Sequence, residues 1–195
     1  MSTENVSVSA DEHTNDAVAD ELLAVRCQLG EASAFDELVG RWHLPLWRYL
    51  RRLIGDEHAA AETLQDVWLA VLRAMPGLRE PARLRAWLFG IARRVVMNHL
   101  RQSYAEPDAV PVDPDDLAAP DENDDLTEDI VRLHDALAGM PVIEREVLVL
   151  FYLRELSLAQ LADVLAVPLG TIKSRLFRAR RMLRQQLTQR ENAND

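Results

Sequence analysis

The chain has 195 residues, of which 48% are apolar, and its formal net charge is −10 at pH 7. The sequence offers no membrane span and no secretory signal, because its longest apolar run, residues 147–153, is far below the roughly 18 residues that a membrane helix needs and its first twenty residues lack Lys and Arg. The single cysteine, Cys27, excludes an internal disulfide and the five His are not spaced as zinc ligands, so we expect a cytoplasmic protein without a metal or other cofactor.

The acidic residues are concentrated in two segments. Residues 1–19 carry four acids and residues 104–129 carry eleven, and neither segment contains a base. The rest of the chain holds all 22 basic residues and 17 acidic ones, so the parts predicted to fold are mildly basic. High charge with few large apolar residues is typical of disordered segments. We therefore predict a disordered N-terminal extension at 1–19, a linker at 104–125 and a disordered tail at 188–195.

Apolar residues at helical spacing predict four helices in the first part of the chain. The first contains Cys27 in its apolar row, which we interpret as a buried core thiol rather than a redox switch. Ser33 is the predicted cap of the second helix, Asp56 is the predicted cap of the third, and Pro81 suits the first turn of the fourth. The predicted helices span residues 18–29, 33–54, 56–75 and 81–100.

After the fourth helix the composition changes. Residues 106–125 hold four prolines, nine acids and little periodicity, which is typical of a flexible tether. Helices resume near residue 126, Pro141 and Ser157 are predicted to start the next two, and the last is predicted over 168–187. No segment shows the alternation expected of a strand. The sequence therefore predicts an all-α fold with two small helical domains, residues 20–103 and 126–187, joined by the acidic linker.

The last two predicted helices form a helix-turn-helix pattern in "LSLAQLADVLAVPLGTIKSRLFRARRML". On the second helix the apolar residues share one face, and the polar and basic residues lie largely opposite. Such a basic face can enter a major groove, where Arg binds phosphate or reads guanine. Ala166 occupies a turn where a Gly would reach a positive φ more easily, at a difference of about 1 kcal/mol. The candidate DNA contacts of this face are Thr171, Lys173, Ser174, Arg175, Arg178 and Arg181.

A lone basic helix would be more simply explained as a solvated surface helix. Two features of this segment favour nucleic acid instead. A short helix and a tight turn come directly before the basic helix, and residues 170–181 contain no acid. We therefore expect this helix to bind DNA.

A second basic segment lies in the first domain. Residues 81–105 contain five Arg and no acid, with aromatic residues between them. Arg and aromatic side chains suit an unpaired strand, because stacking tolerates bases outside the duplex. Trp87, Leu88 and Ile91 are predicted to belong to the core. The candidate DNA contacts are Arg83, Arg93, Arg94, Asn98 and Arg101.

These segments resemble the sigma-70 family of RNA polymerase sigma factors, in particular its extracytoplasmic-function (ECF) group. The helix-turn-helix resembles region 4, which reads the −35 promoter element. "AFDELVGRWHLPLWRYLRRLIGDEHAAAETLQDVWLAVLR" resembles regions 2.1 and 2.2, and "RLRAWLFGIARRVVMNHLRQ" resembles regions 2.3 and 2.4. The resemblance implies that residues 20–103 bind polymerase core and melt the −10 element, with a flipped base captured near residues 76–83. It implies the clamp and flap of the polymerase and promoter DNA as partners.

The linker is long enough for this function. Its 22 residues extend to at most about 70–80 Å, and two turns of B-DNA span about 70 Å. One chain can therefore hold two DNA readers on one promoter. The resemblance implies that the acidic linker runs through a basic channel of the polymerase, although a solvated spacer explains the individual Asp residues equally well.

The third predicted helix departs from the family pattern. Many members carry an acidic cluster resembling "DAED" there, which faces a basic patch on the polymerase clamp. Aligning on Gln65 and Asp66 places Ala at two of the three acidic positions. The four aligned residues are Ala59, Ala60, Ala61 and Glu62. The resemblance leaves Glu62, Gln65 and Asp66 as the predicted polymerase contacts.

Thr63 lies beside this depleted cluster. A phosphate on Thr63 would add about −1.5 to −2 charge, close to the two missing acids. ECF factors that lack the cluster are a kinase-linked subgroup, so the resemblance supports a switch in which a Ser/Thr kinase modifies Thr63 and completes the polymerase-binding surface. The alternative is that Thr63 is an ordinary helix residue and that the three remaining contacts suffice.

The alternative function is a stand-alone helix-turn-helix regulator that binds paired half-sites as a dimer. That reading does not explain the N-terminal domain, and the sequence shows no dimerisation segment. An enzyme is not predicted, since the sequence has no phosphate-binding Gly loop, metal cluster or nucleophile motif. Nothing in the sequence indicates an anti-sigma factor.

Overall fold

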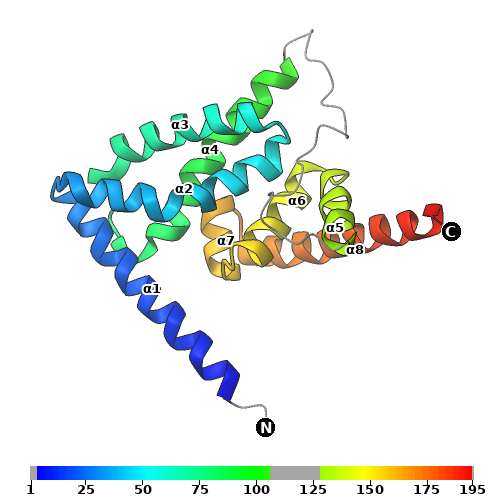
Figure 1. Ribbon diagram of the computed structural model, residues 1–195, viewed down its shortest axis with the longest axis horizontal. Coiled ribbons are helices and arrows are strands. Elements are labelled where there is room, and N and C mark those ends of the chain that lie inside the picture. Colours follow the sequence, from blue (N-terminus) through cyan, green and yellow to red (C-terminus); the bar gives the residue numbers. More distant parts are fainter. Residues whose placement is uncertain (1–3, 106–127, 195) are drawn as a thin grey trace.

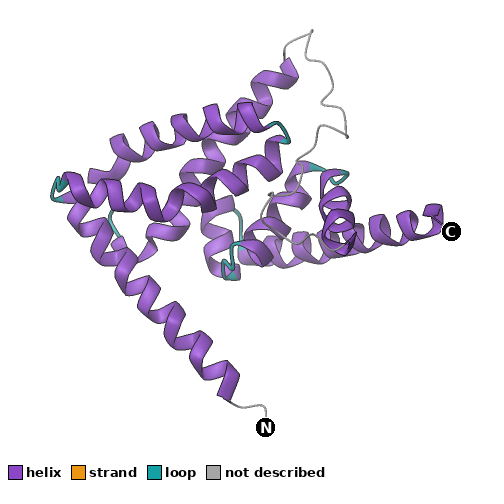
Figure 2. Ribbon diagram, viewed as in Figure 1, coloured by secondary structure: helices purple, strands orange, loops and turns teal. Residues whose placement is uncertain are grey.

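The computed structural model describes residues 4–105 and 128–194, and every regular element within them is helical (Figures 1 and 2). The first group of helices holds α1 (Glu4–Gln28), α2 (Ala32–Ile54), α3 (Glu57–Ala74) and α4 (Leu84–Ala105), with the 3-10 turns η1 (Met75–Gly77) and η2 (Pro81–Arg83) between α3 and α4. The second holds α5 (Glu128–Ala138), α6 (Val142–Leu148), the π-helical turn η4 (Val149–Leu153), α7 (Leu158–Leu165) and α8 (Leu169–Asn194). The all-α prediction is confirmed. The predicted linker lies outside the described residues from residue 106 onward.

α2 is the central helix of the first group and packs against α1, α3 and α4. Its buried side chains recur every three or four residues, which places them on one stripe along the helix. Phe89 of α4 meets this stripe edge-on, with its ring centroid 6.2 Å from that of Trp42 and 5.4 Å from that of Tyr49. The buried stripe of α2 comprises Leu38, Trp42, Leu46, Tyr49, Leu50 and Leu53.

α8 is the long helix of the second group, and α5, α6 and α7 pack against it. Ile172 and Ala179 of α8 are fully buried and Leu176 nearly so, while Leu161 of α7 is fully buried beneath them. The predicted apolar face of the last helix is therefore confirmed at these positions.

Two of the three predicted helix caps are confirmed. The Asp56 carboxylate accepts a hydrogen bond from the Ala59 N–H at 2.6 Å, and Ser157 forms a capping box with Gln160 at the start of α7. The predicted cap at Ser33 is wrong, because α2 begins at Ala32 with Glu31 as its N-cap residue. The Ser33 hydroxyl instead donates to the Glu31 carboxylate at 2.9 Å.

The two terminal helices extend further than the sequence predicts. Residues 4–19 and 188–194, which we expected to be disordered, belong to α1 and α8. Neither extension contains Pro or Gly, and Glu4 in the first turn of α1 favours the helix N-terminus electrostatically. Although α1 and α8 have 25 and 26 residues, no helix in the described part of the chain combines the length and apolarity needed to cross a membrane.

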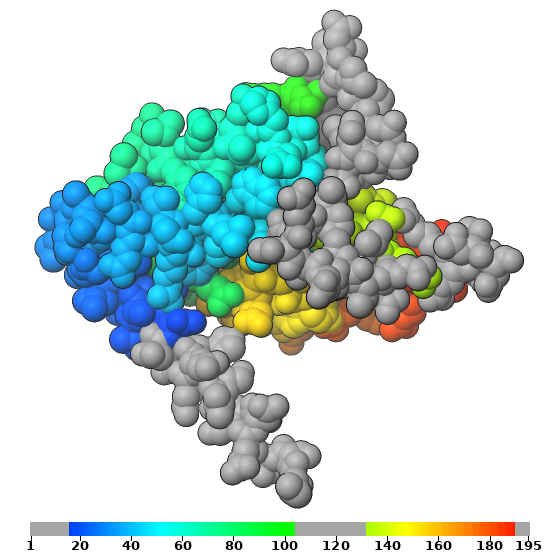
Figure 3. Space-filling view, in the orientation of Figure 1, coloured from blue at the N-terminus to red at the C-terminus, as the bar shows by residue number. Residues whose placement is uncertain are grey.

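The two groups of helices pack directly against each other. α4 contacts α7, and α2 contacts α6 and η4. In Figure 3 the yellow and orange surface of the second group adjoins the blue and cyan surface of the first. The two predicted domains are therefore in contact in this structure. The boundary between them includes α4, which carries candidate −10 contacts, and α7, the first helix of the helix-turn-helix.

Candidate nucleic-acid and polymerase interfaces

The start of α8 is held in place by the turn that precedes it. Ala166 ends α7 with φ 52° and ψ 46°, so a non-glycine residue occupies the left-handed conformation, as predicted. Its N–H is hydrogen-bonded to carbonyls of the last turn of α7, and the Thr171 N–H donates to the Pro168 carbonyl at 2.8 Å. These bonds fix the angle at which α8 leaves the turn, while its buried apolar face fixes its rotation.

Most of the predicted −35 contacts lie on the exposed side of α8. Lys173, Ser174, Arg178 and Arg181 are exposed. The Ser174 hydroxyl donates to the Thr171 carbonyl at 2.9 Å, so it is engaged with the helix backbone in this conformation. The structure therefore presents a mainly basic face whose three cations are all accessible to solvent.

Two predicted contacts on α8 are less exposed. Thr171 and Arg175 are both half-buried. Burial raises the pKa of the Glu146 carboxyl on α6, and Arg175 is one of the cations that oppose this shift. Arg175 is therefore positioned differently from Arg178 and Arg181, which the sequence pattern did not distinguish.

Two neighbours of the basic face were not anticipated from the sequence. The Glu144 carboxylate, buried on α6, forms an ion pair with Arg178, which orients that guanidinium. Arg180 lies over the rings of Phe151 and Tyr152, with its guanidinium carbon 5.6 Å and 5.3 Å from their centroids. Only the proximity of these residues in the fold reveals the contacts, because they come from separate helices.

The predicted −10 contacts, in η2 and on α4, differ in their surroundings. Arg94, Asn98 and Arg101 are exposed and line a surface hollow together with Arg93 and with Asp66 of α3. The Arg101 guanidinium donates to the Met97 carbonyl at 3.2 Å, which keeps it against its own helix. This set is available to a ligand. Among the residues expected in the core, Leu88 and Ile91 are buried and Trp87 is half-buried.

The second set faces the other domain. Arg93 is 24% exposed and its Nε lies 3.1 Å from a carboxylate oxygen of Glu146 on α6. Arg83, in η2, places a guanidinium nitrogen 3.1 Å from a carboxylate oxygen of Asp163 on α7. Arg83 also lies 3.3 Å from a carboxylate oxygen of Glu80 in its own domain and is 54% exposed, so Arg93 is the more covered of these two cations.

Glu146 is the centre of this boundary. It is fully buried, and the Tyr49 hydroxyl donates to its carboxylate at 2.8 Å. Burial raises the pKa of the Glu146 carboxyl above its ordinary value, against the opposing charges of Arg93 and Arg175. Burial, together with the Glu146 charge, also raises the pKa of Tyr49 well above its usual range.

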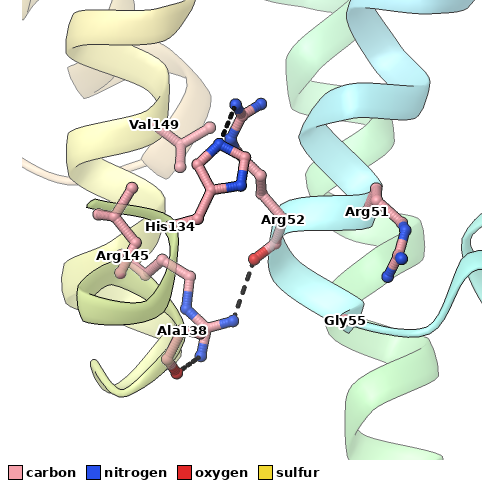
Figure 4. A pocket seen from close by; sticks show the side chains of 8 residues that line it. Arg51, Arg52, Gly55, His134, Ala138, Arg145 and Val149 are labelled. Carbon is pink, nitrogen blue, oxygen red and sulfur yellow. Dashed lines mark hydrogen bonds between the residues drawn. The ribbon is translucent and has the colours of Figure 1, made fainter. Parts of the chain in front are cut away.

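A neighbouring pocket lies between α2, α5 and α6 (Figure 4). The Arg145 guanidinium donates to the Ala138 and Met140 carbonyls at 2.9 and 3.0 Å, which caps the end of α5. The same group donates to the Arg52 carbonyl at 3.0 Å, so it also joins the two domains. Arg145 is therefore part of the boundary between the domains.

The predicted polymerase contacts lie on the outer face of α3. Glu62, Gln65 and Asp66 are exposed. Leu69 and Leu72, which are 49% and 53% exposed, continue the same helical face. Helical periodicity alone does not separate these two leucines from core residues. The face thus combines a short acidic stretch with an apolar end.

Thr63 does not lie on that face. Its side chain is 3% exposed, and its hydroxyl donates to the Ala59 carbonyl at 2.7 Å. Thr63 is therefore next to Glu62 in the sequence but is not part of the exposed face in this structure. The helical position of Thr63, one residue past Glu62, turns it toward α2 and the core.

Comparison with known families accounts for both domains. The family "Sigma-70 region 2" matches residues 38–105, and "Sigma-70, region 4" matches residues 130–183. ECF RNA polymerase sigma factor SigC of Mycobacterium tuberculosis is 31% identical over 159 residues, covering 81% of this chain and 85% of that protein. The chain belongs to the ECF group of the sigma-70 family. It is a non-enzymatic initiation factor that directs RNA polymerase to promoters.

Other relatives agree with this assignment. ECF sigma factor SigM of Mycobacterium tuberculosis H37Rv is 32% identical over 163 residues, covering 84% of this chain and 81% of that protein. The solved structure of the sigma factor RpoE with the anti-sigma factor NepR from Bartonella quintana aligns with a TM-score of 0.68 at 24% identity, over 79% of this chain and 96% of that one. CnrH in complex with the cytosolic domain of CnrY gives 0.65 at 24% identity, over 87% and 97%. The two structures share the fold of this sigma factor.

Proposed function

We propose that this ECF sigma factor reads the −35 element with α8, engages the −10 element with α4 and docks on the polymerase clamp with α3. The observation that carries the proposal is the outer face of α8, where Lys173, Arg178 and Arg181 are exposed while the opposite face is buried in the domain. A helix anchored in this way can enter a major groove without losing its packing.

Within the −35 contact, Arg178 is the best-placed base reader. Its pair with Glu144 holds the guanidinium at a defined position, and Arg reads guanine through two parallel hydrogen bonds that require such positioning. Lys173 and Arg181 suit phosphate contacts on either side. We assign Thr171, Ser174 and Arg175 to supporting contacts, because their polar groups lie against the protein in this structure.

Within the −10 contact, Arg83, Arg94, Asn98 and Arg101 form the accessible part of the surface. Arg93 completes it once its pair with Glu146 is broken. Arg side chains beside exposed bases supply both charge and stacking, which suits a melted strand. The melting step therefore depends on cations from two elements, η2 and α4.

On the polymerase side, Glu62, Gln65 and Asp66 supply the polar contacts and Leu69 and Leu72 supply apolar area. As the alternative to a switch at Thr63, these leucines compensate for the missing acids of the family cluster. Because each leucine is already about half-buried, burying the rest contributes about 1 kcal/mol each, comparable to an ordinary hydrogen bond. The clamp and flap of the core enzyme are the proposed protein partners.

Phosphorylation of Thr63 by a Ser/Thr kinase is a further hypothesis, and it requires that the buried Thr63 hydroxyl first becomes exposed. The buried hydroxyl must leave its bond to the Ala59 carbonyl, so the first turns of α3 have to open before a kinase reaches it. A phosphate there would then hold the turn open, since a dianion is not tolerated in an apolar core.

The test of the switch compares Thr63→Ala with the parent in cells under inducing conditions. Loss of promoter activity with normal folding and normal polymerase binding in vitro would support it. Full activity of Thr63→Ala would refute it. Acids restored at Ala59 and Ala61 are the control, because they should give activity without a kinase if the missing charge is the cause.

The test of the assignment as a whole uses purified chain and purified RNA polymerase core. Transcript starts mapped after overexpression define the promoters, and run-off transcription on those promoters should appear only when both components are present. Binding to the promoters as a dimer without core enzyme would favour the stand-alone regulator instead.

A further inference from the structure

α1 carries apolar side chains on two opposite faces. One face is buried in region 2 through Leu23 and Ala24, which are 2% and 0% exposed. The Leu29 N–H donates to the Val25 carbonyl at 3.0 Å, so the helical geometry continues through Leu29. The opposite face, which we name the outer stripe, has four exposed apolar side chains: Val18 (60% exposed), Leu22 (60%), Val25 (37%) and Leu29 (81%).

The outer stripe has the spacing of a helix–helix contact. Its side chains follow one another at steps of four, three and four residues, which places them within about 60° of one another around the helix axis. These are the steps of the a and d positions, through which one helix packs against another. A surface helix needs only one apolar face, and a row of exposed apolar residues, unlike single ones, indicates a binding surface.

The surroundings of the outer stripe are acidic. α1 contains six acids and one Arg, and this Arg26 is held by the carboxylates of Glu31 and Glu37, each at 2.7 Å. Like charges placed opposite each other disfavour binding. A nucleic acid, an anionic membrane or a second copy of this acidic helix is therefore disfavoured as the partner, and a protein surface with basic side chains is favoured.

The length of the outer stripe also disfavours a homodimer. It spans 12 residues, whereas a coiled coil needs about three to four heptads. Leu occupies its a positions and Val its d positions, the reverse of the arrangement that favours a parallel two-helix coiled coil. A standard protein–protein interface has about 20–30 residues a side. The outer stripe therefore suits one part of a larger interface.

The outer stripe ends beside the helix that faces the polymerase in the proposed function. The Gln28 side chain donates to the Met75 and Leu78 carbonyls at 3.3 and 2.6 Å, which fastens the end of α1 to the segment that follows α3. The last turns of α1 and α3 therefore meet at one end of region 2 (Figure 1). There α3 carries the exposed Leu69 and Leu72. Both surfaces are apolar with acidic neighbours, so a partner of one chemistry fits both.

We propose that the outer stripe of α1 is a second docking surface for core RNA polymerase, and that it takes an apolar surface of the core enzyme flanked by basic side chains. The stripe extends the docking face of α3 around the end of region 2. This inference rests on the proposed docking of α3 on the polymerase.

The experiment titrates purified RNA polymerase core into the full chain, which carries a fluorophore at its C-terminus, and measures the dissociation constant. The variant with both Leu22→Gln and Leu29→Gln removes the two most extended apolar side chains and keeps good helix formers in their place. Its dissociation constant should rise about tenfold or more, because each leucine loses its burial against the core enzyme.

A second variant tests the charge of the partner. Glu21→Lys reverses an exposed acid that lies next to Leu22 in α1. It should also weaken binding to core enzyme, and its difference from the parent should shrink at high salt, where charges at the surface are screened. An effect of Glu21→Lys in the opposite direction would contradict a basic partner.

The matched control is Leu44→Gln on α2, which changes a leucine of 48% exposure outside the outer stripe and should leave the dissociation constant unchanged. The variant with both Leu69→Gln and Leu72→Gln tests the α3 face separately. Weak binding by this variant with normal binding by the α1 variant would contradict the present inference alone. The reverse result would contradict the proposed docking of α3 alone.

The proposal is overturned if the Leu22→Gln and Leu29→Gln variant binds core enzyme like the parent while circular dichroism shows the parent's helix content. It is also overturned if sedimentation velocity shows that the free parent is a dimer which this variant dissociates, because the occupant is then a second copy. Hydroxyl-radical footprinting of the unmutated chain decides the case if the variant does not fold. Core enzyme should protect Leu22 and Leu29 from oxidation several-fold, and unchanged oxidation would refute the docking.

Discussion

The two helices that carry the candidate DNA contacts, α4 and α8, have similar sequences of Arg and apolar residues but different surroundings. α8 presents Lys173, Arg178 and Arg181 to solvent, and its acidic partner, Glu144, lies in its own domain. α4 presents Arg94 to solvent, but its neighbour Arg93 is paired with an acid of the other domain. The pattern of basic residues therefore indicates where DNA binds, while the acids opposite them determine which of those residues are accessible in the free chain.

The largest effect is expected for Arg178→Ala in the holoenzyme. Loss of a base contact costs about 1–3 kcal/mol, so affinity for the −35 element should fall about 5- to 150-fold, and discrimination against a scrambled −35 sequence should fall with it. Arg184→Ala, an exposed position further along α8, is the control and should weaken all DNA sequences equally. Binding assays at fixed salt measure both, and unchanged discrimination in Arg178→Ala would contradict its role as a reader.

The next effect concerns α4. The variant with both Arg93→Ala and Arg94→Ala should bind core polymerase normally but form several-fold fewer open complexes, because it lacks two cations of the −10 surface. Permanganate footprinting of unpaired thymines measures the open complexes. Normal melting by this variant would remove α4 from the proposed −10 contact.

A smaller effect tests the turn that aims α8. Ala166→Gly should raise the free energy of unfolding by about 1 kcal/mol or less, since Gly adopts the observed φ of 52° without the strain of a Cβ. Denaturant titration of the full chain gives the value. A loss of stability would mean that the Ala166 methyl group contributes more by packing than it costs in strain.

The smallest effect concerns two carboxylates that each pair with Arg. Hydrogen bonds from Arg26 lower the pKa of Glu31 to about 2, whereas burial raises that of Glu146. The Glu31 contribution to stability is therefore present above its ordinary pKa of 4.5 and is lost as pH falls through about 2. The raised pKa of Glu146 means that its carboxyl stabilises the folded structure with the two domains in contact at pH values below 4.5. This stabilisation is lost as pH rises through the raised pKa. Carboxyl NMR titrations should show the two groups on opposite sides of 4.5, and equal values would contradict this assignment.

Local sequence signals predicted the fold well where the interacting residues are close in the chain. Asp56, Ser157 and Ala166 behave as expected, because each acts on a turn only a few residues away. The prediction for Ser33 is wrong for a specific reason. The Glu31 carboxylate, two residues earlier, accepts hydrogen bonds from Arg26 at 2.7 Å and from the Ser33 hydroxyl, so this hydroxyl does not cap α2. Competition of this kind depends on the angle between α1 and α2, which a linear pattern does not contain.

The candidate site was only partly predictable. The exposed cations of α8 follow from periodicity, whereas the role of Glu146 does not, since an acid within "EREV" looks like an ordinary solvent-facing helix residue. Its burial depends on Tyr49, which is 97 positions away in the chain. The burial of Thr63 likewise follows from how α3 rotates against α2, which the alignment of acidic residues does not reveal.

The difference in solvent accessibility between Arg93 and Arg94 can be measured directly. An arginine-specific dicarbonyl reagent applied to the free chain, followed by mass spectrometry, gives the modification rate of each residue. We predict that Arg94 reacts several-fold faster than Arg93 in the parent, and that Arg93 reacts faster in Glu146→Gln, which lacks the carboxylate charge beside its guanidinium. Equal rates in the parent would show that the −10 cations are uncovered in the free chain and would contradict the account.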